Sequence, residues 1–102
     1  MRFKRVKGTR DVLPREALAR RELEKLIYER FSRAGFLPIL TPTFEAYELY
    51  QRSTGQASDI VIKEMYRFAD MGGRDLALRP EATPSVMRAV LENHLKIPIR
   101  LW

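Results

Sequence analysis

The segment Leu78–Pro84 (LRPEATP) contains residue types that can hold an amino acid. Glu81 offers a carboxylate and Thr83 a hydroxyl, where an expected strand passes into an expected helix. Such a junction gathers backbone N–H groups and the positive end of a helix dipole. A carboxylate placed there can pair with a cationic amino group. The structural alternative is that Thr83 caps the helix and Glu81 complements its dipole.

Two other segments combine charges with small residues. Residues 7–11 (KGTRD) form a glycine turn between opposite charges, but they lack the length and glycine spacing of a phosphate-binding loop. Residues 53–64 form a loop of small residues surrounded by four charged side chains, Arg52, Asp59, Lys63 and Glu64. A structural turn and a solvated charged loop are the simpler interpretations of these two segments.

The composition excludes several other kinds of site. The chain has no cysteine, which excludes disulfides, thiol nucleophiles and cysteine-bound zinc. The single histidine, His94, excludes a histidine-rich metal site, and we expect it on the surface. No apolar run approaches the ~20 residues of a membrane span, and residues 1–10 lack the apolar core of a secretory signal. We therefore expect a cytoplasmic protein without a metal site.

The charge is unevenly distributed along the 102 residues. The chain has 19 Lys and Arg against 13 Asp and Glu, a formal net charge of +6. The first ten residues hold five cations and no acid: Arg2, Lys4, Arg5, Lys7 and Arg10. A basic segment of this kind can contact phosphate or an acidic surface. The alternative is a solvated tail.

The apolar spacing predicts three helices. The clearest is 14–34, which has Pro14 at its start and Gly35 just beyond its end. A short helix is expected over 46–52. A third helix should start with Thr83 as N-cap and Pro84 as its first residue, and end near Asn93.

Strands are expected over five short segments, with residues 41–45 extended between two of them. The expected strands are 3–6, 36–40, 64–69, 75–79 and 99–102, with a turn at 70–74 that makes a hairpin of the third and fourth. We expect Pro38 to put 36–40 at an edge or bend it there. The fold class is therefore α+β, with a mainly antiparallel sheet flanked by helices, in one domain spanning 1–102.

Seven of these segments together resemble histidyl-tRNA synthetase, a class II aminoacyl-tRNA synthetase. They occur in the family's order and at its approximate spacing, and they are KGTRDVLP (7–14), AGF (34–36), TPTFE (41–45), SDIV (58–61), KEMYRF (63–68), GGR (72–74) and LRPEAT (78–83). Each is weakly specific alone. Jointly they extend the resemblance from Lys7 to Trp102.

The resemblance implies a ligase of protein biosynthesis that activates histidine with ATP and Mg²⁺ and transfers it to tRNA. It assigns Glu81, Ala82 and Thr83 to the histidine pocket. The helix 14–34 and the strand through Pro42 are similar to class II motif 1, which builds a homodimer interface, so Pro42 and Phe44 become interface residues. A family that handles tRNA makes Lys4, Arg5, Lys7 and Arg10 candidates for phosphate contacts.

The sequence departs from the family pattern in two ways. Ala82 stands where the family usually has glycine, and its methyl group can crowd a close backbone approach. The motif 2 loop, which holds the ATP phosphate, and motif 3 are absent from the 102 residues. We therefore expect an incomplete catalytic domain that is not competent alone, and whether the chain is itself an enzyme stays open.

Two other functions fit parts of the pattern. One is a synthetase-like regulatory subunit of ATP phosphoribosyltransferase, which would bind histidine or a partner enzyme without making aminoacyl-tRNA. The other is a basic interaction module that contacts tRNA or protein through the N-terminal segment, with binding that falls steeply with salt.

Overall fold

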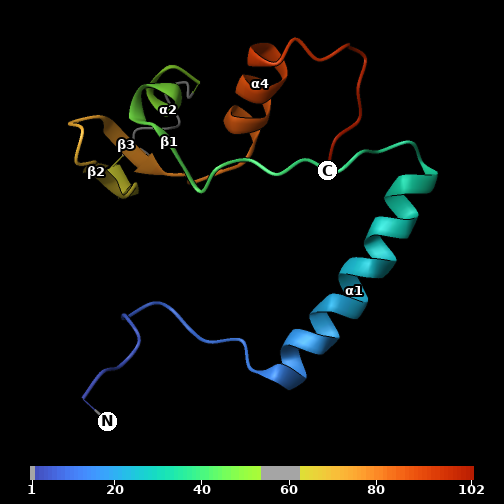
Figure 1. Cartoon of the computed structure of the whole chain (residues 1–102), viewed down its shortest axis with the longest axis horizontal. Coiled ribbons are helices and arrows are strands. Elements are labelled where there is room, and N and C mark those ends of the chain that lie inside the picture. The colour runs from blue at the N-terminus through green and yellow to red at the C-terminus, as the bar shows by residue number, and fades with distance from the viewer. Residues whose placement is uncertain (1, 54–62) are drawn as a thin grey trace. The chain divides into compact units, whose positions relative to one another are not determined.

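A computed structural model describes residues 2–53 and 63–102. The chain divides into two compact units, Met1–Leu37 together with Trp102, and Pro38–Leu101. Figure 1 shows the helices and strands of both units. Each unit is described by itself below. The loop expected over 53–59 lies almost entirely outside the described residues, as does Asp59.

The first unit is built on a long helix, α1 (Pro14–Arg33), which confirms the expected helix. Pro14 starts it, where a missing N–H costs no hydrogen bond. Gly35, with φ of +80°, follows its end in the left-handed conformation that glycine adopts without strain. None of the residues of α1 is buried.

The basic segment before α1 is not a strand, so the expected strand over 3–6 is wrong. The Val6 carbonyl accepts hydrogen bonds from the Thr9 backbone N–H at 3.0 Å and from the Thr9 hydroxyl at 2.6 Å. Gly8 turns the chain between them with a φ of +87°. This local turn uses the Val6 carbonyl, which a neighbouring strand would need as a hydrogen-bond acceptor.

Aromatic rings gather near the end of α1. The Trp102 ring stacks on Phe31 with ring centroids 5.4 Å apart, and Tyr28 and Phe36 adjoin this pair. The Trp102 backbone N–H donates to the Leu37 carbonyl at 3.1 Å. The expected strands over 36–40 and 99–102 do not form strands of the sheet. Pro38 lacks the N–H that a continuing ladder needs.

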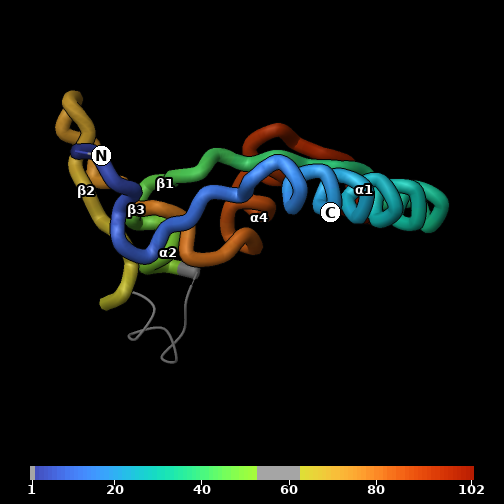
Figure 2. The backbone as a smooth tube through the Cα atoms, turned by 90° about the horizontal axis from the view of Figure 1, so that it is seen from below, coloured from blue at the N-terminus to red at the C-terminus, as the bar shows by residue number. Residues whose placement is uncertain are grey.

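The second unit contains a three-stranded antiparallel sheet. Its strands are β1 (Phe44–Ala46), β2 (Arg67–Ala69) and β3 (Asp75–Leu78), in the order β1-β3-β2. The expected hairpin of β2 and β3 is confirmed, although β2 is short because Lys63 and Glu64 are helical. The sheet and its helices confirm the α+β class. Figure 2 shows the same chain from a second direction.

Two helices accompany the sheet, α2 (Tyr47–Ser53) and α4 (Thr83–Glu92). Both match expected helices to within one residue, and α4 ends before Asn93 as expected. α2 contacts β1, β3 and α4. The small core lies under α2 and consists of Tyr47, Tyr50 and Ala77.

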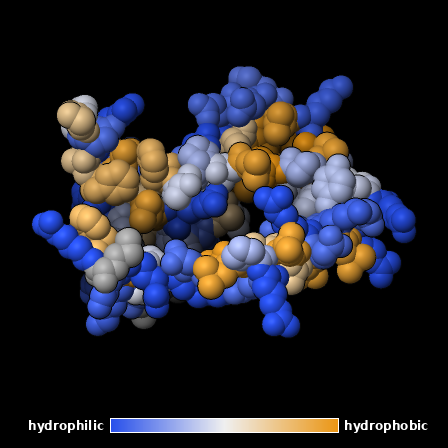
Figure 3. Space-filling model, turned by 60° about the horizontal axis from the view of Figure 1, so that its bottom comes forward, coloured by the Kyte–Doolittle hydropathy of each residue, from blue (hydrophilic) through white to orange (hydrophobic). Residues whose placement is uncertain are grey.

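The strand register separates two unlike faces of the sheet. Glu45, Ala77 and Arg67 are aligned across the three strands on the face that contains the core. The opposite face carries apolar side chains, including Phe44 opposite Leu78 and Phe68 opposite Leu76. Phe44, Phe68 and Leu78 remain exposed. Apolar side chains reach the surface in Figure 3 as well. In the described part of the unit, these three side chains of this sheet face are therefore open to solvent.

The two units differ in charge. Residues 1–37 hold 11 Lys and Arg against 5 Asp and Glu, whereas residues 38–101 hold 8 of each. The formal net charge of +6 therefore belongs to the first unit. The second unit, which carries the segment LRPEATP, is formally neutral.

Candidate functional site

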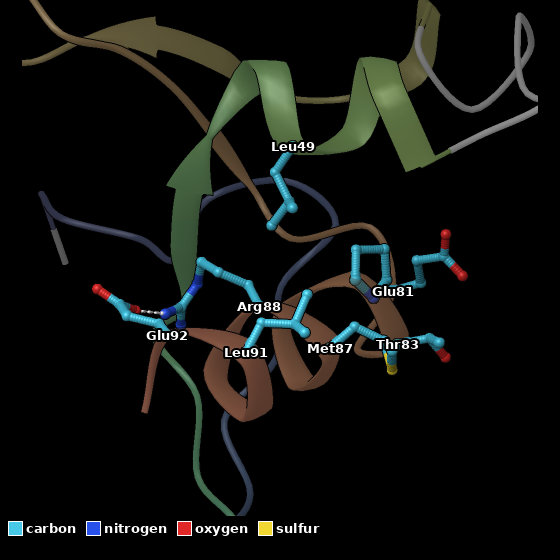
Figure 4. Close-up of a pocket in the computed structure, with 8 residues that line it drawn as sticks. Leu49, Glu81, Thr83, Met87, Arg88, Leu91 and Glu92 are labelled. Carbon is cyan, nitrogen blue, oxygen red and sulfur yellow. Dashed lines mark hydrogen bonds and ion pairs between the residues drawn. The ribbon is translucent and has the colours of Figure 1, made fainter. Parts of the chain in front are cut away.

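A pocket of about 700 Å³ lies between α2 and α4 in the second unit. Its lining comes from α2, from the end of the segment LRPEATP and from one side of α4: Leu49, Glu81, Thr83, Pro84, Met87, Arg88, Leu91 and Glu92. The structure thus brings Glu81 and Thr83, selected from the sequence alone, to one cavity. Figure 4 shows their side chains at one end of it and the pair Arg88 and Glu92 at the other.

Thr83 does not cap α4, contrary to expectation. Ala82 is the N-cap, Thr83 is the first helical residue and Pro84 the second, and no side chain makes a capping hydrogen bond. Ala82 already has φ and ψ near the helical region, so the helix boundary lies one residue earlier than expected. The Thr83 hydroxyl is therefore not used to cap the helix.

Glu81 precedes the first turn of α4, where the helix dipole favours an anion. Among the described residues, no cation forms an ion pair with its carboxylate. Glu81, Ala82 and Thr83 are all exposed. The carboxylate and the hydroxyl are both accessible to a ligand that offers hydrogen-bond donors.

The opposite end of the pocket is held by an ion cluster centred on Arg88. Its Nε and Nη2 donate to Glu45 Oε1 at 3.1 and 2.9 Å, and its Nη1 donates to Glu92. The Glu45 side chain is only 8% exposed, whereas that of Glu92 is 65% exposed. The hydrogen bonds to Glu45 hold the pKa of the Arg88 guanidinium above its ordinary value. Arg88 is thus a structural cation that fastens α4 to β1.

Four further hydrogen bonds fasten the segment LRPEATP and the start of α4 to the residues before β1 and to α2. The Arg79 backbone N–H donates to the Thr43 carbonyl at 3.0 Å, and Arg79 Nη1 donates to both the carbonyl and the hydroxyl of Thr41 at 3.1 Å. Under α2, the hydroxyls of Tyr50 and Ser85 lie 3.3 Å apart, and both side chains are fully buried. These contacts fix the start of α4, and therefore Glu81 and Thr83.

Sequence reasoning missed Arg88, Glu45 and Leu49. Arg88 interrupts the apolar run Val86–Leu91, and an isolated charge in such a run signals a buried partner. Nothing local identifies Glu45 as that partner, because 43 positions separate the two residues.

The basic candidates lie in the first unit. Arg10 pairs with Glu16 at 2.6 Å, and this hydrogen bond lowers the pKa of the Glu16 carboxyl. Arg5 Nε donates to the Thr9 carbonyl at 2.8 Å, while Lys4 and Lys7 are exposed. Two of the four cations are therefore partly engaged within their own segment.

The remaining candidates are on the surface of the second unit. Pro42 and Phe44 are exposed, as the resemblance requires of interface residues, and so is His94, as expected. Arg52 forms an ion pair with Glu48 on α2 at 2.5 Å, so the charge of Arg52 has a partner within its own helix. Within 2–53 and 63–102, no three Asp, Glu or His side chains gather into a group that could hold a metal ion.

Comparison with known proteins shows which family shares the sequence around this pocket. The family model described as histidyl-tRNA synthetase matches residues 8–102, a stretch that contains the whole pocket. The chain belongs to the histidyl-tRNA synthetase family. The resemblance inferred from the seven segments is thereby confirmed.

The relatives give the extent of the match within the synthetase family. The histidine–tRNA ligase of Lactococcus lactis subsp. cremoris strain MG1363 is 47% identical over 107 residues, which covers 100% of this chain and 25% of the relative. That of Lactobacillus johnsonii is 49% identical over 98 residues, covering 96% and 23%. The chain therefore spans about a quarter of the length of these relatives.

Solved structures show the same proportion. Apo histidyl-tRNA synthetase of S. aureus superposes with a TM-score of 0.79 at 32% identity, covering 97% of this chain and 24% of that one. A protein of Bacillus halodurans C, named as an ATP phosphoribosyltransferase regulatory subunit/histidyl-tRNA synthetase, superposes with a TM-score of 0.81 at 27% identity, covering 98% of this chain and 26% of that one.

In the described part of this chain, no helix is long and apolar enough to cross a membrane.

Proposed function

We propose that this chain forms the opening part of the catalytic domain of a histidyl-tRNA synthetase and supplies one side of its histidine site. The observation that carries the proposal is the pair Glu81 and Thr83. Both open onto one pocket at the start of α4, neither caps the helix, and no cation of the described residues pairs with Glu81.

In this proposal each residue of the pair has a defined role. The Glu81 carboxylate accepts hydrogen bonds from the α-ammonium group of histidine, and the Thr83 hydroxyl fixes the orientation of the same substrate. The Ala82 methyl group limits how closely the substrate approaches the backbone. ATP and Mg²⁺ serve the activation of histidine in the whole enzyme. Among the described residues no three Asp, Glu or His side chains gather into one group, and ATP and Mg²⁺ are assigned to no residue of this chain.

Two further roles, a homodimer interface and contacts with tRNA, are proposed for the whole enzyme, which we place in the cytoplasm. Pro42 and Phe44 lie on an exposed apolar segment and contribute to a homodimer interface. Lys4, Arg5, Lys7 and Arg10 contact tRNA phosphates, and the charge of the first unit supports this role. The ligase activity requires parts of the enzyme beyond the 102 residues.

A second function is supported by the similarity to the Bacillus halodurans protein, whose name combines both activities. As a regulatory subunit, the chain would use the same pocket to sense histidine without transferring it to tRNA. Stimulation of an ATP phosphoribosyltransferase by this chain would favour that function, whereas pyrophosphate exchange in the experiment below favours the ligase.

The ligase proposal is tested in a chimera in which this chain replaces the matching quarter of the Lactococcus lactis ligase. We expect histidine-dependent ATP–pyrophosphate exchange from the chimera and none from the 102 residues alone. Glu81→Gln should raise the KM for histidine about 10- to 100-fold, the effect of losing a hydrogen bond to a charged group. Glu48→Gln, at an exposed position of α2 that does not line the pocket, is the matched control. An unchanged KM in a folded Glu81→Gln chimera would refute the assignment.

A further inference from the structure

Two buried hydroxyl groups meet beside the start of α4. The side chains of Tyr50 on α2 and Ser85 on α4 are both fully buried, and their hydroxyl oxygens lie 3.3 Å apart. Burying a hydroxyl group is unfavourable unless the group finds a partner, and phenylalanine and alanine would fill nearly the same space without that cost. The filling of the core therefore does not explain why these two positions carry hydroxyl groups.

The contribution of this pair to stability is small. Hydroxyl groups that bond well lie about 2.7–2.8 Å apart, so a separation of 3.3 Å indicates a weak hydrogen bond. A weak hydrogen bond still restricts geometry, because it forms only when the two groups face each other. The contact between Tyr50 and Ser85 thus favours one orientation of α4 against α2 more than it stabilises the unit.

The first turn of α4 has few other anchors. No side chain caps the helix, and an uncapped end leaves its first N–H groups without helical partners. Arg88 fastens α4 to Glu45 of β1, but Arg88 lies about 7.5 Å along the helix from Thr83. Within the described residues, Ser85 is the residue of this turn whose side chain forms a hydrogen bond to another element.

The same turn carries a residue that we assign to histidine. Thr83 and Ser85 are two positions apart, which places them about 200° apart around the helix, so Thr83 lines the pocket while Ser85 contacts Tyr50. Groups that bind a ligand selectively must be held to within about 0.5 Å. An anchor at Ser85 gives this precision to Thr83 and to Glu81, which directly precedes the turn.

We propose that Tyr50 and Ser85 are positioning residues of the histidine site, and that their hydroxyl contact holds the first turn of α4 so that Glu81 and Thr83 meet the substrate together. The proposal deepens the proposed function and rests on it for the identity of the ligand. Neither Tyr50 nor Ser85 contacts histidine in this proposal, since both act through the backbone of α4. Loss of either hydroxyl group should therefore weaken the site without unfolding the unit.

The first test measures the order of the turn in the 102 residues themselves. The Val86 N–H donates to the Ala82 carbonyl in the first turn, and the Asn93 N–H donates to the Ala89 carbonyl at the other end of α4, both at 3.1 Å. Tyr50→Phe should speed amide hydrogen exchange at Val86 by about five-fold or more and leave that at Asn93 within about two-fold. Equal acceleration at both amides would show a general loss of stability and would overturn the proposal, as would no change at either.

The second test uses the chimera with the Lactococcus lactis ligase. Tyr50→Phe and Ser85→Ala should each raise the KM for histidine about 3- to 10-fold, the effect of losing one neutral hydrogen bond, and leave kcat within about two-fold. Because both variants remove the same contact, the double variant should bind no more weakly than either single variant. Tyr47→Phe is the matched control, since Tyr47 belongs to the same helix and core but its ring packs against the Arg67 guanidinium.

The outcomes separate this proposal from the proposed function. An unchanged KM in both variants, additive effects in the double variant, or an equal effect of Tyr47→Phe overturns the positioning role, even where Glu81→Gln raises the KM as expected. If Glu81→Gln leaves the KM unchanged, or the chimera shows no pyrophosphate exchange, the proposed function fails. The amide hydrogen exchange at Val86 then decides by itself whether Tyr50 and Ser85 hold the turn.

Discussion

The ion cluster of Arg88 gives the most quantitative prediction. Replacing Arg88 by Met keeps most of the side-chain volume and removes both donors from Glu45, whose carboxylate is 8% exposed. Hydrogen bonds to charged groups contribute about 1.5–3 kcal/mol, and removing one partner of a buried pair costs about 3–5 kcal/mol. Because the Arg88 side chain is 29% exposed, solvent screens the pair, and we expect a loss of about 2 kcal/mol.

This loss is large for a small domain. A change of about 2 kcal/mol lowers the melting temperature of a domain of this size by about 8–16 °C. The assay is urea unfolding followed by circular dichroism, with thermal unfolding as a second measurement. Glu92→Gln is the control, because it removes the other partner of Arg88 at an exposed position and should cost less than about 0.5 kcal/mol.

The double variant Glu45→Gln/Arg88→Met completes a thermodynamic cycle. Removing both charges should restore part of the loss, because no buried carboxylate is then left without its cation. Equal costs for Arg88→Met and Glu92→Gln would refute the reasoning, since the buried contact would then contribute no more than the exposed one.

Two further predictions concern the hairpin. Gly73→Ala should lower the free energy of unfolding by about 1 kcal/mol, because Gly73 has a φ of +78°, whereas Gly72→Ala should cost less in the same urea titration. Arg67 donates to both oxygens of Asp75 and holds the pKa of that carboxyl below its ordinary 3.8, so this contribution is complete above about pH 4 and is lost as the pH falls further. Unfolding midpoints measured from pH 6 to pH 2 should therefore fall less steeply for Arg67→Gln, and parallel curves would contradict the role of the pair.

The elements predicted correctly are those whose signals are local. Pro14 and Gly35 mark the two ends of α1, and the glycines of the hairpin turn mark the reversal between β2 and β3. Each signal depends on the conformations that one residue allows, so it needs no knowledge of the rest of the fold.

The wrong strand predictions concern segments that needed a partner. Residues 3–6 alternate in polarity as a strand does, yet a strand forms only beside another strand, and Thr9 takes the Val6 carbonyl instead. β2 is shorter than its pattern for another reason, because Lys63 and Glu64 are helical. Alternation reports which face a strand would bury, but not whether a neighbouring strand is present.

The residues of the candidate site also fall into those that the sequence predicts and those that it does not. Glu81 and Thr83 were predictable because they are two positions apart and flank a helix start. The wall opposite them was not, because Leu49 lines the pocket from α2 and Glu45 holds Arg88 from β1, both more than 30 positions before Glu81 in the chain. Such contacts depend on how β1, α2 and α4 pack, which the spacing of residues does not encode.

The unequal charge of the two units affects how copies of the chain behave toward one another. The second unit has eight charges of each sign and exposes Phe44, Phe68 and Leu91. A neutral surface with exposed apolar side chains favours precipitation at neutral pH. The first unit, with its excess of six cations, provides the mutual repulsion that keeps copies dispersed. We therefore expect the basic N-terminal residues to oppose aggregation of the chain, a role separate from any contact with RNA.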